Sequence, residues 1–197
     1  YSRTLLPRCV AERLIKMLIL ASASPRRRQL MEEAGMRFEL APKFECDESY
    51  PAALPTAEVA AFLSALKSNA YPEALSDEDI LITADTTVVV DDRVLGKPSD
   101  REEAYEMLRA MSGRGHRVYT GVSLRSKSKV QTFSAESEVY FREMDDEEIF
   151  YYIDNYRPYD KAGAYGIQEW IGYVAIERIE GSFYNVMGLP IPRLYKE

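Results

Sequence analysis

Three consecutive arginines, at positions 26–28, stand where a helix is expected to begin. The preceding residues 17–22 (MLILAS) predict a short buried strand, and Ser24 followed by Pro25 is a typical helix start. Free backbone N–H groups and the helix dipole favour anions at such a start and disfavour cations. A bound phosphate would offset the arginines, with Ser22 and Ser24 as compact hydroxyl donors. The alternative is an arginine run that faces only solvent.

A lone carboxylate, Asp85, interrupts a segment that otherwise predicts a strand buried on both faces. Residues 79–90 (DILITADTTVVV) are β-branched and almost continuously apolar. Burial of an unpaired charge is costly, so Asp85 needs a cation, hydrogen bonds or contact with solvent. A turn at residues 91–92 would bring Lys97 almost opposite Asp85 on a returning strand. The pair is either part of an active site or a salt bridge at the edge of the sheet.

The segment DKAGAYGIQ, residues 160–168, combines two glycines with polar ends. Gly163 and Gly166 suit a close approach of the backbone to another group better than they suit side-chain packing. Lys161 and Gln168 flank them. Such a segment is most often only a turn, so it gains weight only beside the first two signals.

Apolar periodicity and capping residues predict the elements that must hold these groups. Helices are expected from Pro25 to about Gly35, between Pro55 and Pro72, from a Ser99 cap with Glu102 three residues on to Gly113, and from Asp145 and Glu148 through Ile153. Strands are expected at 17–22, 79–90, 116–124, 131–141 and 172–179. The predicted fold class is mixed α/β, in one domain.

Composition limits the partners of the chain. With 46% apolar residues among 197, it can bury the core of one domain. A net charge of −7 argues against nucleic-acid binding, and no run approaches the roughly 18 apolar residues of a membrane span. Two cysteines, Cys9 and Cys46, make neither a disulfide framework nor a zinc motif, which predicts a reducing, cytoplasmic location. The single histidine, His116, is expected to be structural or peripheral, because no Ser-His-Asp arrangement accompanies it.

Residues 1–16 differ from the rest of the chain, because they carry four basic side chains and one acidic one. We expect them to be a wrongly assigned start, an expression remnant or an added arm. Residues 17–197 then form the single domain.

Five segments also carry a resemblance to a known family. They are LILASASPRRRQL at 18–30, ITADTTVVVDDRVLGKP at 82–98, SGRGHRVYTGV at 112–122, YDKAGAYGIQ at 159–168 and GSFYNVMGLP at 181–190. Their type and order resemble the Maf family of nucleoside triphosphate pyrophosphatases. The resemblance runs from about Met17 to Leu194.

The resemblance implies a fold and an activity. The implied fold is a mixed α/β structure with a long central mixed sheet flanked by helices and a cleft between two lobes, related to inosine triphosphate pyrophosphatases. The implied reaction is hydrolysis of a nucleoside triphosphate between the α and β phosphates, with a divalent cation, Mg²⁺ or Mn²⁺. A homodimer is also implied.

Carried over motif by motif, the resemblance assigns the site residues. Phosphate binding falls to Ser22, Ser24, Arg26, Arg27, Lys67 and Lys97, and the role of base to Asp85. Asp85 would orient and deprotonate the attacking water, and it is also a candidate metal ligand.

The end of segment 160–168 bears on the substrate. A glutamine there is similar to the branch that acts on dTTP and UTP, whereas a sister branch with a different sequence prefers 7-methyl-GTP. Arg26, Thr86 and Gln168 occupy the positions linked to the choice of base.

At two positions this chain does not match the family pattern in a simple way. The family commonly has glycine where this chain has Thr83, which could alter the strand or the floor of the cleft. The acidic residue on the metal side falls in FECDES, residues 44–49, where Asp47 and Glu48 both fit. Glu48 is the predicted ligand.

Two other functions remain open from the sequence. One keeps the enzyme but assigns it modified pyrimidine nucleotides, as a house-cleaning hydrolase. The other is a non-catalytic protein that binds nucleotide and regulates cell division. Asp85, Lys97 and both site arginines argue against the second, because a pure binder has no need of a base beside the phosphates.

Overall fold

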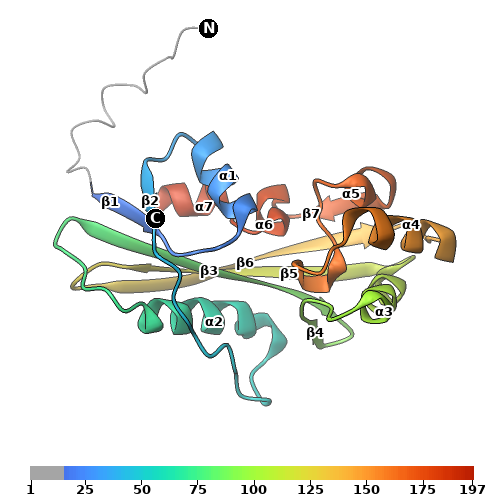
Figure 1. Ribbon diagram of the computed structural model, residues 1–197, viewed down its shortest axis with the longest axis horizontal. Coiled ribbons are helices and arrows are strands. Elements are labelled where there is room, and N and C mark those ends of the chain that lie inside the picture. Colours follow the sequence, from blue (N-terminus) through green and yellow to red (C-terminus); the bar gives the residue numbers. More distant parts are fainter. Residues whose placement is uncertain (1–15) are drawn as a thin grey trace, which may run out of the picture.

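A long central sheet of seven strands organises the chain in the computed structural model, which describes residues 16–197 (Figure 1). The predicted arm of residues 1–16 therefore lies, apart from Lys16, outside the described residues. The strands are β1 (Met17–Leu20), β2 (Phe38–Leu40), β3 (Asp79–Val90), β4 (Arg93–Leu95), β5 (Gly115–Arg125), β6 (Val130–Phe141) and β7 (Ile176–Glu180).

The sheet is mixed, as predicted. Its order is β2-β1-β3-β5-β6-β7, with β4 paired to β3. The pairs of β1 with β2 and with β3 are parallel, and the other pairs are antiparallel. The long β3, β5 and β6 form its centre, so a segment packed on them is held by most of the sheet.

Helices cover both faces of this sheet. They are α1 (Pro25–Glu33), α2 (Thr56–Ala70), α3 (Arg101–Met111), α4 (Asp146–Tyr156), α5 (Trp170–Val174), α6 (Phe183–Met187) and α7 (Ile191–Lys196), with a 3₁₀ turn at Ala162–Ala164. In Figure 1, α2 lies below the sheet, α1, α6 and α7 lie above it, and α3, α4 and α5 gather at one end. In the described part of the chain, no helix is both long and apolar enough to cross a membrane.

Local signals explain where several helices begin and end. In α1, Pro25 is the first helical residue, Leu30 and Met31 are buried, and Gly35 follows the helix with a φ of +70° that glycine adopts without strain. For α4, Asp145 and Glu148 form the predicted capping box. These boundaries confirm the corresponding predictions.

Two predicted boundaries were wrong. The N-cap of α3 is Asp100 rather than Ser99, and its side chain accepts a hydrogen bond from the Glu103 N–H at 2.9 Å. Ser99 does not cap the helix, because its N–H and hydroxyl both donate to the carboxylate of Glu103 at 2.7 Å. The strand expected at 172–179 begins only at Ile176, because Gly172 belongs to α5 and its N–H donates to the carbonyl of Glu169. A short apolar run does not distinguish strand from helix by its pattern.

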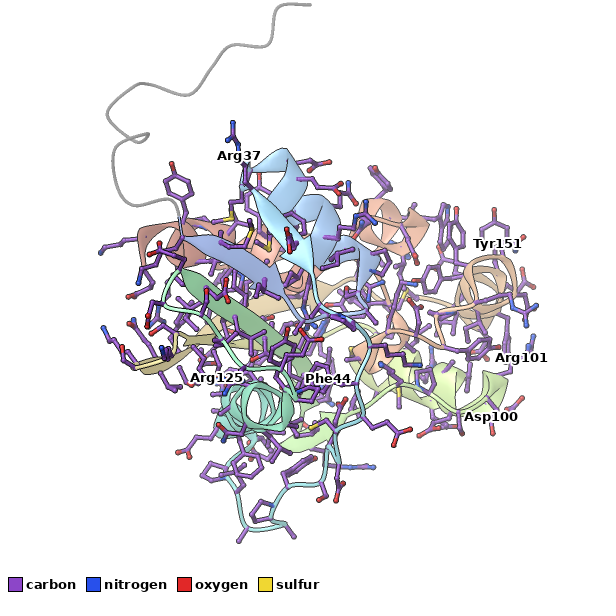
Figure 2. All side chains as sticks on the ribbon, turned by 60° about the vertical axis from the view of Figure 1, so that its left-hand side comes forward. Arg37, Phe44, Asp100, Arg101, Arg125 and Tyr151 are labelled. Carbon is purple, nitrogen blue, oxygen red and sulfur yellow. The ribbon has the colours of Figure 1, made fainter. Side chains whose placement is uncertain are left out.

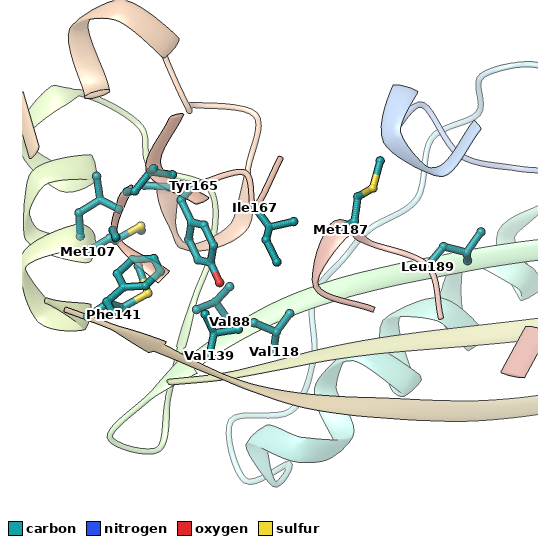
Figure 3. Close-up of a cluster of buried hydrophobic side chains, with 14 of the residues drawn as sticks. Val88, Met107, Val118, Val139, Phe141, Tyr165, Ile167, Met187 and Leu189 are labelled. Atoms are coloured by element: carbon teal, nitrogen blue, oxygen red, sulfur yellow. The ribbon is translucent and has the colours of Figure 1, made fainter. Parts of the chain in front are cut away.

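The buried core packs α3, α4 and the 3₁₀ turn against the sheet. Figure 3 shows Tyr165 close to Val88, Val118 and Val139, the valines coming from three neighbouring strands. Its hydroxyl is 2.7 Å from Nε2 of His116, which is 2% exposed. The residues that follow Tyr165 are thus tied to the rigid centre of the sheet.

Parallel pairing of β1 with β3 brings distant segments together at one point. Leu20 lies beside Ile82, and the N–H of Ala21 donates to the carbonyl of Ile82. The turn that starts at Ser22 therefore leaves β1 alongside the middle of β3, where Asp85 lies. Strand register, rather than sequence proximity, thus places the helix start of α1 beside the lone carboxylate.

Candidate active site

A cavity of about 1040 Å³ opens at this point. Its walls come from the turn between β1 and α1, the loop after β2, α2, β3, the segment after β4, residues 160–168 and α6. All ten predicted site residues line it, and Asp47 does so as well. Groups separated by up to about 150 positions in the sequence therefore face one space.

Asp85 lies on β3 against Lys67 of α2. Nζ of Lys67 is 2.6 Å from Oδ1 of Asp85 and 3.1 Å from Oε2 of Glu48. The side chains of Lys67 and Asp85 are 17% and 13% exposed, and that of Glu48 is 53% exposed. One ammonium thus joins a mostly buried carboxylate to a carboxylate at the mouth of the cavity.

The loop after β2, residues 41–55, brings Glu48 to this position. Phe44 anchors it, because its ring and that of Tyr71, which directly follows α2, form a T-shaped pair with centroids 5.6 Å apart. Figure 2 shows Phe44 beside α2. Asp47 is engaged differently, because its Oδ1 accepts a hydrogen bond from the N–H of Ser49 at 3.1 Å.

The predicted pairing of Lys97 with Asp85 was wrong. The ladder between β3 and β4 ends at Val88 and Leu95, so Lys97 lies beyond the last paired residue of β4. Among the described residues, the ion-pair partner of Asp85 is Lys67. Lys97 still lines the cavity, but the chain reaches it through a loop and not through a strand.

Arg27 enters the cavity from α1 and is held by neutral groups. Its Nε donates to the carbonyl of Gly188 at 2.8 Å, Nη1 donates to Oγ of Ser22 at 3.2 Å, and Nη2 donates to Oγ1 of Thr86 at 3.0 Å. No carboxylate of the described chain forms an ion pair with it. Burial lowers the pKa of Arg27, and the nearby charge of Asp85 opposes that effect. A partly buried cation without a paired anion is suited to an anionic ligand.

The neighbouring arginines are arranged differently. Nη1 of Arg26 lies 3.3 Å from Oδ2 of Asp160. Arg28 is exposed and pairs with Glu32 along the helix, so for this residue the solvent-facing alternative is correct. Ser24 is the N-cap residue of α1, but its side chain makes no capping bond.

A network of charges holds segment 160–168 at the rim. The 8%-exposed Lys161 places Nζ 2.7 Å from Asp160 and 3.1 Å from Glu169. The hydroxyl of Tyr152 donates to Glu169 at 2.5 Å and accepts the N–H of Gly166 at 3.0 Å. Burial opposes ionisation of Asp160, but the hydrogen bond and charge of Lys161, followed by those of Arg26, lower its pKa overall.

Asp160 is a residue of this site that the sequence argument did not select. It bridges Arg26 and Lys161, two cations that line the cavity. A signal for it existed, since Lys161 had been singled out in the same segment and a cation near arginines requires a carboxylate.

Gln168 lies at the end of the same segment, and its Oε1 is buried without a hydrogen-bond partner. The residue lines the cavity and is itself partly exposed. Because a buried polar atom is rarely left unpaired, this oxygen or its amide partner is available to a ligand.

Two other expectations concern residues away from the cavity. Thr83, the departure from the family pattern, is fully buried and donates its hydroxyl to the carbonyl of Ser64 in α2 at 2.7 Å. It packs sheet against helix and leaves the cavity floor to Ala84 and Asp85. His116 is structural, because burial lowers its pKa to about 3 and it packs on Phe141 with centroids 4.9 Å apart.

The carboxylates fit a divalent cation that is also held by a substrate. Glu48 and Asp85 contact the same ammonium, so their oxygens already lie around one cationic centre. Oxygen ligands of this kind suit Mg²⁺ or Mn²⁺. No cluster of three or more His, Cys, Asp or Glu able to hold a metal occurs among residues 16–197. A cation held by these two carboxylates would need water or ligand oxygens at its remaining positions, as is usual for Mg²⁺.

Comparison with known proteins points to one family. The model of that family, described as Maf-like protein, matches residues 17–197. A dTTP/UTP pyrophosphatase of Parabacteroides distasonis is 52% identical over 180 residues, which cover 91% of this chain and 93% of that protein. A dTTP/UTP pyrophosphatase of Porphyromonas gingivalis is 52% identical over 182 residues, covering 91% and 92%. Among solved structures, the Staphylococcus aureus Ham1 protein is similar with a TM-score of 0.47 and 16% identity, covering 64% of this chain and 72% of that one.

Proposed function

The chain belongs to the Maf family, and we propose that it is a nucleoside triphosphate pyrophosphatase acting on dTTP and UTP. It would cleave the bond between the α and β phosphates and release the monophosphate and pyrophosphate. The observation that carries the proposal is the shared cavity, in which the carboxylate of Asp85 faces the same space as Arg26, Arg27, Lys67 and Lys97.

Hydrolysis at the α-phosphorus makes three demands on the site. The attacking water must lose a proton, the charge on the phosphate oxygens must be balanced, and the leaving pyrophosphate must be stabilised. We assign the removal of the proton from the attacking water to Asp85. Because Lys67 binds its Oδ1, we assign Oδ2 to the water.

The bond changes follow from these positions. The water oxygen bonds to the α-phosphorus and gives its proton to Asp85, while the bridging P–O bond breaks and its electron pair leaves with the β-phosphate. Arg27 has five N–H groups and uses three on neutral acceptors, which leaves one on each terminal nitrogen for phosphate oxygens. Lys97 offers a further ammonium at the same cavity. In a water-poor site each such donor contributes several kcal/mol to the transition state, about 3 kcal/mol being typical.

Glu48 and Asp85 would hold the divalent cation together with the substrate. When bound, Mg²⁺ or Mn²⁺ supplies charge neutralisation on the phosphates and lowers the pKa of a bound water. Lys67 orients both carboxylates before the substrate arrives, because its ammonium lies within 3.1 Å of each.

Gln168 is our candidate for reading the base. A primary amide offers both a donor and an acceptor, which complements the neighbouring N–H and carbonyl groups of thymine and uracil. The buried and unpartnered Oε1 of Gln168 supports this role. Arg26 and Thr86 line the same cavity and would take part in the same choice.

One assay tests the proposal. The purified protein is mixed with each common triphosphate, and with modified pyrimidine triphosphates, in the presence of Mg²⁺ or Mn²⁺, and pyrophosphate and orthophosphate are measured separately. We expect pyrophosphate release to be fastest with dTTP and UTP. Orthophosphate alone would mean cleavage at another bond, binding without hydrolysis would support the non-catalytic alternative, and faster turnover of a modified nucleotide would support house-cleaning.

The proposal extends to assembly and location. The family resemblance leads us to propose a homodimer, which sedimentation of the purified chain tests. Two cysteines in 197 residues support a reducing compartment, and we propose the cytoplasm.

A further inference from the structure

We infer that Thr120, a β5 residue outside the predicted site, positions the guanidinium of Arg27 for its ligand. A chain of hydrogen bonds runs from the cavity into the protein. Nη2 of Arg27 donates to Thr86, the hydroxyls of Thr86 and Thr120 are 2.9 Å apart, and Thr120 donates to the carbonyl of Asn185 at 2.9 Å. The inference rests on the proposed function only for its kinetic test.

Only one direction of this chain satisfies all of its donors. A guanidinium nitrogen can only donate, so Thr86 must accept the bond from Arg27. A threonine hydroxyl has a single proton, and that of Thr120 goes to the carbonyl of Asn185. The bond between the two hydroxyls is therefore donated by Thr86. Thr120 thus keeps the proton of Thr86 turned away from Arg27.

The burial of Thr120 and Asn185 fixes the direction of the hydrogen bond from Thr86 to Thr120. Thr120 and Asn185 are fully buried, so water cannot replace either of them as a partner. Thr86 and Thr120 are directly paired across β3 and β5, which fixes the distance between their hydroxyls through the backbone. When Thr120 is replaced, the partly buried hydroxyl of Thr86 loses its acceptor on the protein side.

The same C-terminal segment holds Arg27 at a second point. The carbonyl of Gly188 accepts from Nε of Arg27 at 2.8 Å, and the N–H of Gly188 donates to the carbonyl of Asn185 at 3.0 Å. The side-chain amide of Asn185 is in turn fixed by Val118 and Ser137. The end of α6 therefore binds Arg27 directly through Gly188 and indirectly through Thr120.

Arg27 is therefore held in place while its positive charge stays available to a ligand. Its protein partners are all neutral, and the acceptor on Nη2 exists only while Thr86 points its proton at Thr120. Without the oxygen of Thr120, the Thr86 proton is free to turn toward Arg27 and oppose it. Arg27 would then lose orientation while the fold and the other site groups remain.

Replacement of Thr120 tests the inference. Thr120→Val keeps the shape and removes the hydroxyl, Thr120→Ser restores the hydroxyl, and Thr120→Ala serves if valine prevents folding. Thr83→Val is the matched control. Thr83 is equally buried, lies on β3, and donates one hydrogen bond that does not belong to the series from Arg27 to Asn185. Hydrogen exchange of the Arg27 Nε–H is followed by NMR in the ligand-free protein, and kcat/KM is measured for dTTP.

We expect Thr120→Val to accelerate this exchange and to lower kcat/KM about tenfold, mainly through KM, as is usual for one hydrogen bond to a charged group. Thr120→Ser should restore both values, and Thr83→Val should change neither. In a Thr86→Val background, Thr120→Val should have no further effect, since the connection is already broken.

Three results would overturn the inference: unchanged exchange in Thr120→Val, the same changes in Thr83→Val, or additive effects in the Thr86→Val background. If the protein hydrolyses no triphosphate, the proposed function fails, and the exchange measurement still decides the role of Thr120.

Discussion

The ammonium of Lys67 lies 2.6 Å from the carboxylate of Asp85 and 3.1 Å from that of Glu48. One helix residue thus connects a mostly buried carboxylate on β3 with a half-exposed one on a loop. The arrangement keeps two acidic groups next to each other in front of the cavity, where their repulsion would otherwise be unfavourable. It makes separate predictions for the two carboxylates.

Asp85→Asn should lower kcat for dTTP about a hundredfold or more, because the amide cannot accept the proton of the attacking water. Affinity for the nucleotide should be kept or increased, since a negative charge beside the phosphates is removed. Steady-state kinetics and calorimetric titration measure the two quantities. Unchanged turnover would remove the assignment of Asp85 as the base.

Glu48→Gln should raise the Mg²⁺ concentration needed for half-maximal rate about tenfold, because the charge of the ligands governs affinity for hard cations. Asp47→Asn is the matched control, because its side chain can still accept the N–H of Ser49. Rates measured over a range of Mg²⁺ concentrations, with chelator as the zero point, separate the two variants. A larger effect of Asp47→Asn would exchange their roles.

Gln168→Leu should lower kcat/KM for dTTP and UTP about tenfold or more relative to other triphosphates, because a hydrogen-bonded base loses its partner. Gln131→Leu, at a partly exposed position of β6, controls for the loss of an amide elsewhere. Competition between paired nucleotides gives the ratio directly. An equal loss for all nucleotides would make Gln168 a structural residue.

Gly121→Ala should destabilise the fold by about 1–3 kcal/mol, because a Cβ at this position would lie 2.2 Å from the carbonyl oxygen of Ala60 and α2 would have to move. Activity should fall as well, since α2 carries Lys67. Urea unfolding measures the change. Gly96→Ala, where an added Cβ has nothing within 4 Å, should be close to neutral, and an equal cost there would refute the close contact as the cause.

Stability should decline in mild acid because of His116. Burial lowers its pKa to about 3 from an ordinary value of 6.5, so between these values only the unfolded chain binds the proton and stability falls as pH falls. From pH 7 to pH 5 this amounts to about 2 kcal/mol. Urea unfolding at both values should show a correspondingly smaller loss for His116→Gln. Equal losses in both proteins would show that His116 titrates normally.

The sequence was sufficient for features that depend on neighbouring residues. Helix α1 starts at Pro25 and ends before Gly35, α4 is capped by Asp145 and Glu148, and the apolar run 79–90 is a buried strand. Each of these signals acts within a few positions of the sequence. Ten residues that line the cavity also came from the sequence, through single motifs and the resemblance to the Maf family, whereas Asp160 did not.

Partners separated by long stretches of chain depended on the tertiary structure. The sequence predicted that Lys97 pairs with Asp85, on the assumption of a longer hairpin. The ladder ends at Leu95, and the packing of α2 places Lys67 beside Asp85 instead. Thr120 carried no local signal, since its importance arises only where β3, β5 and α6 meet. Local patterns constrain the backbone of one segment, whereas hydrogen bonds and ion pairs require distances of about 3 Å that only strand register and helix packing between distant segments determine.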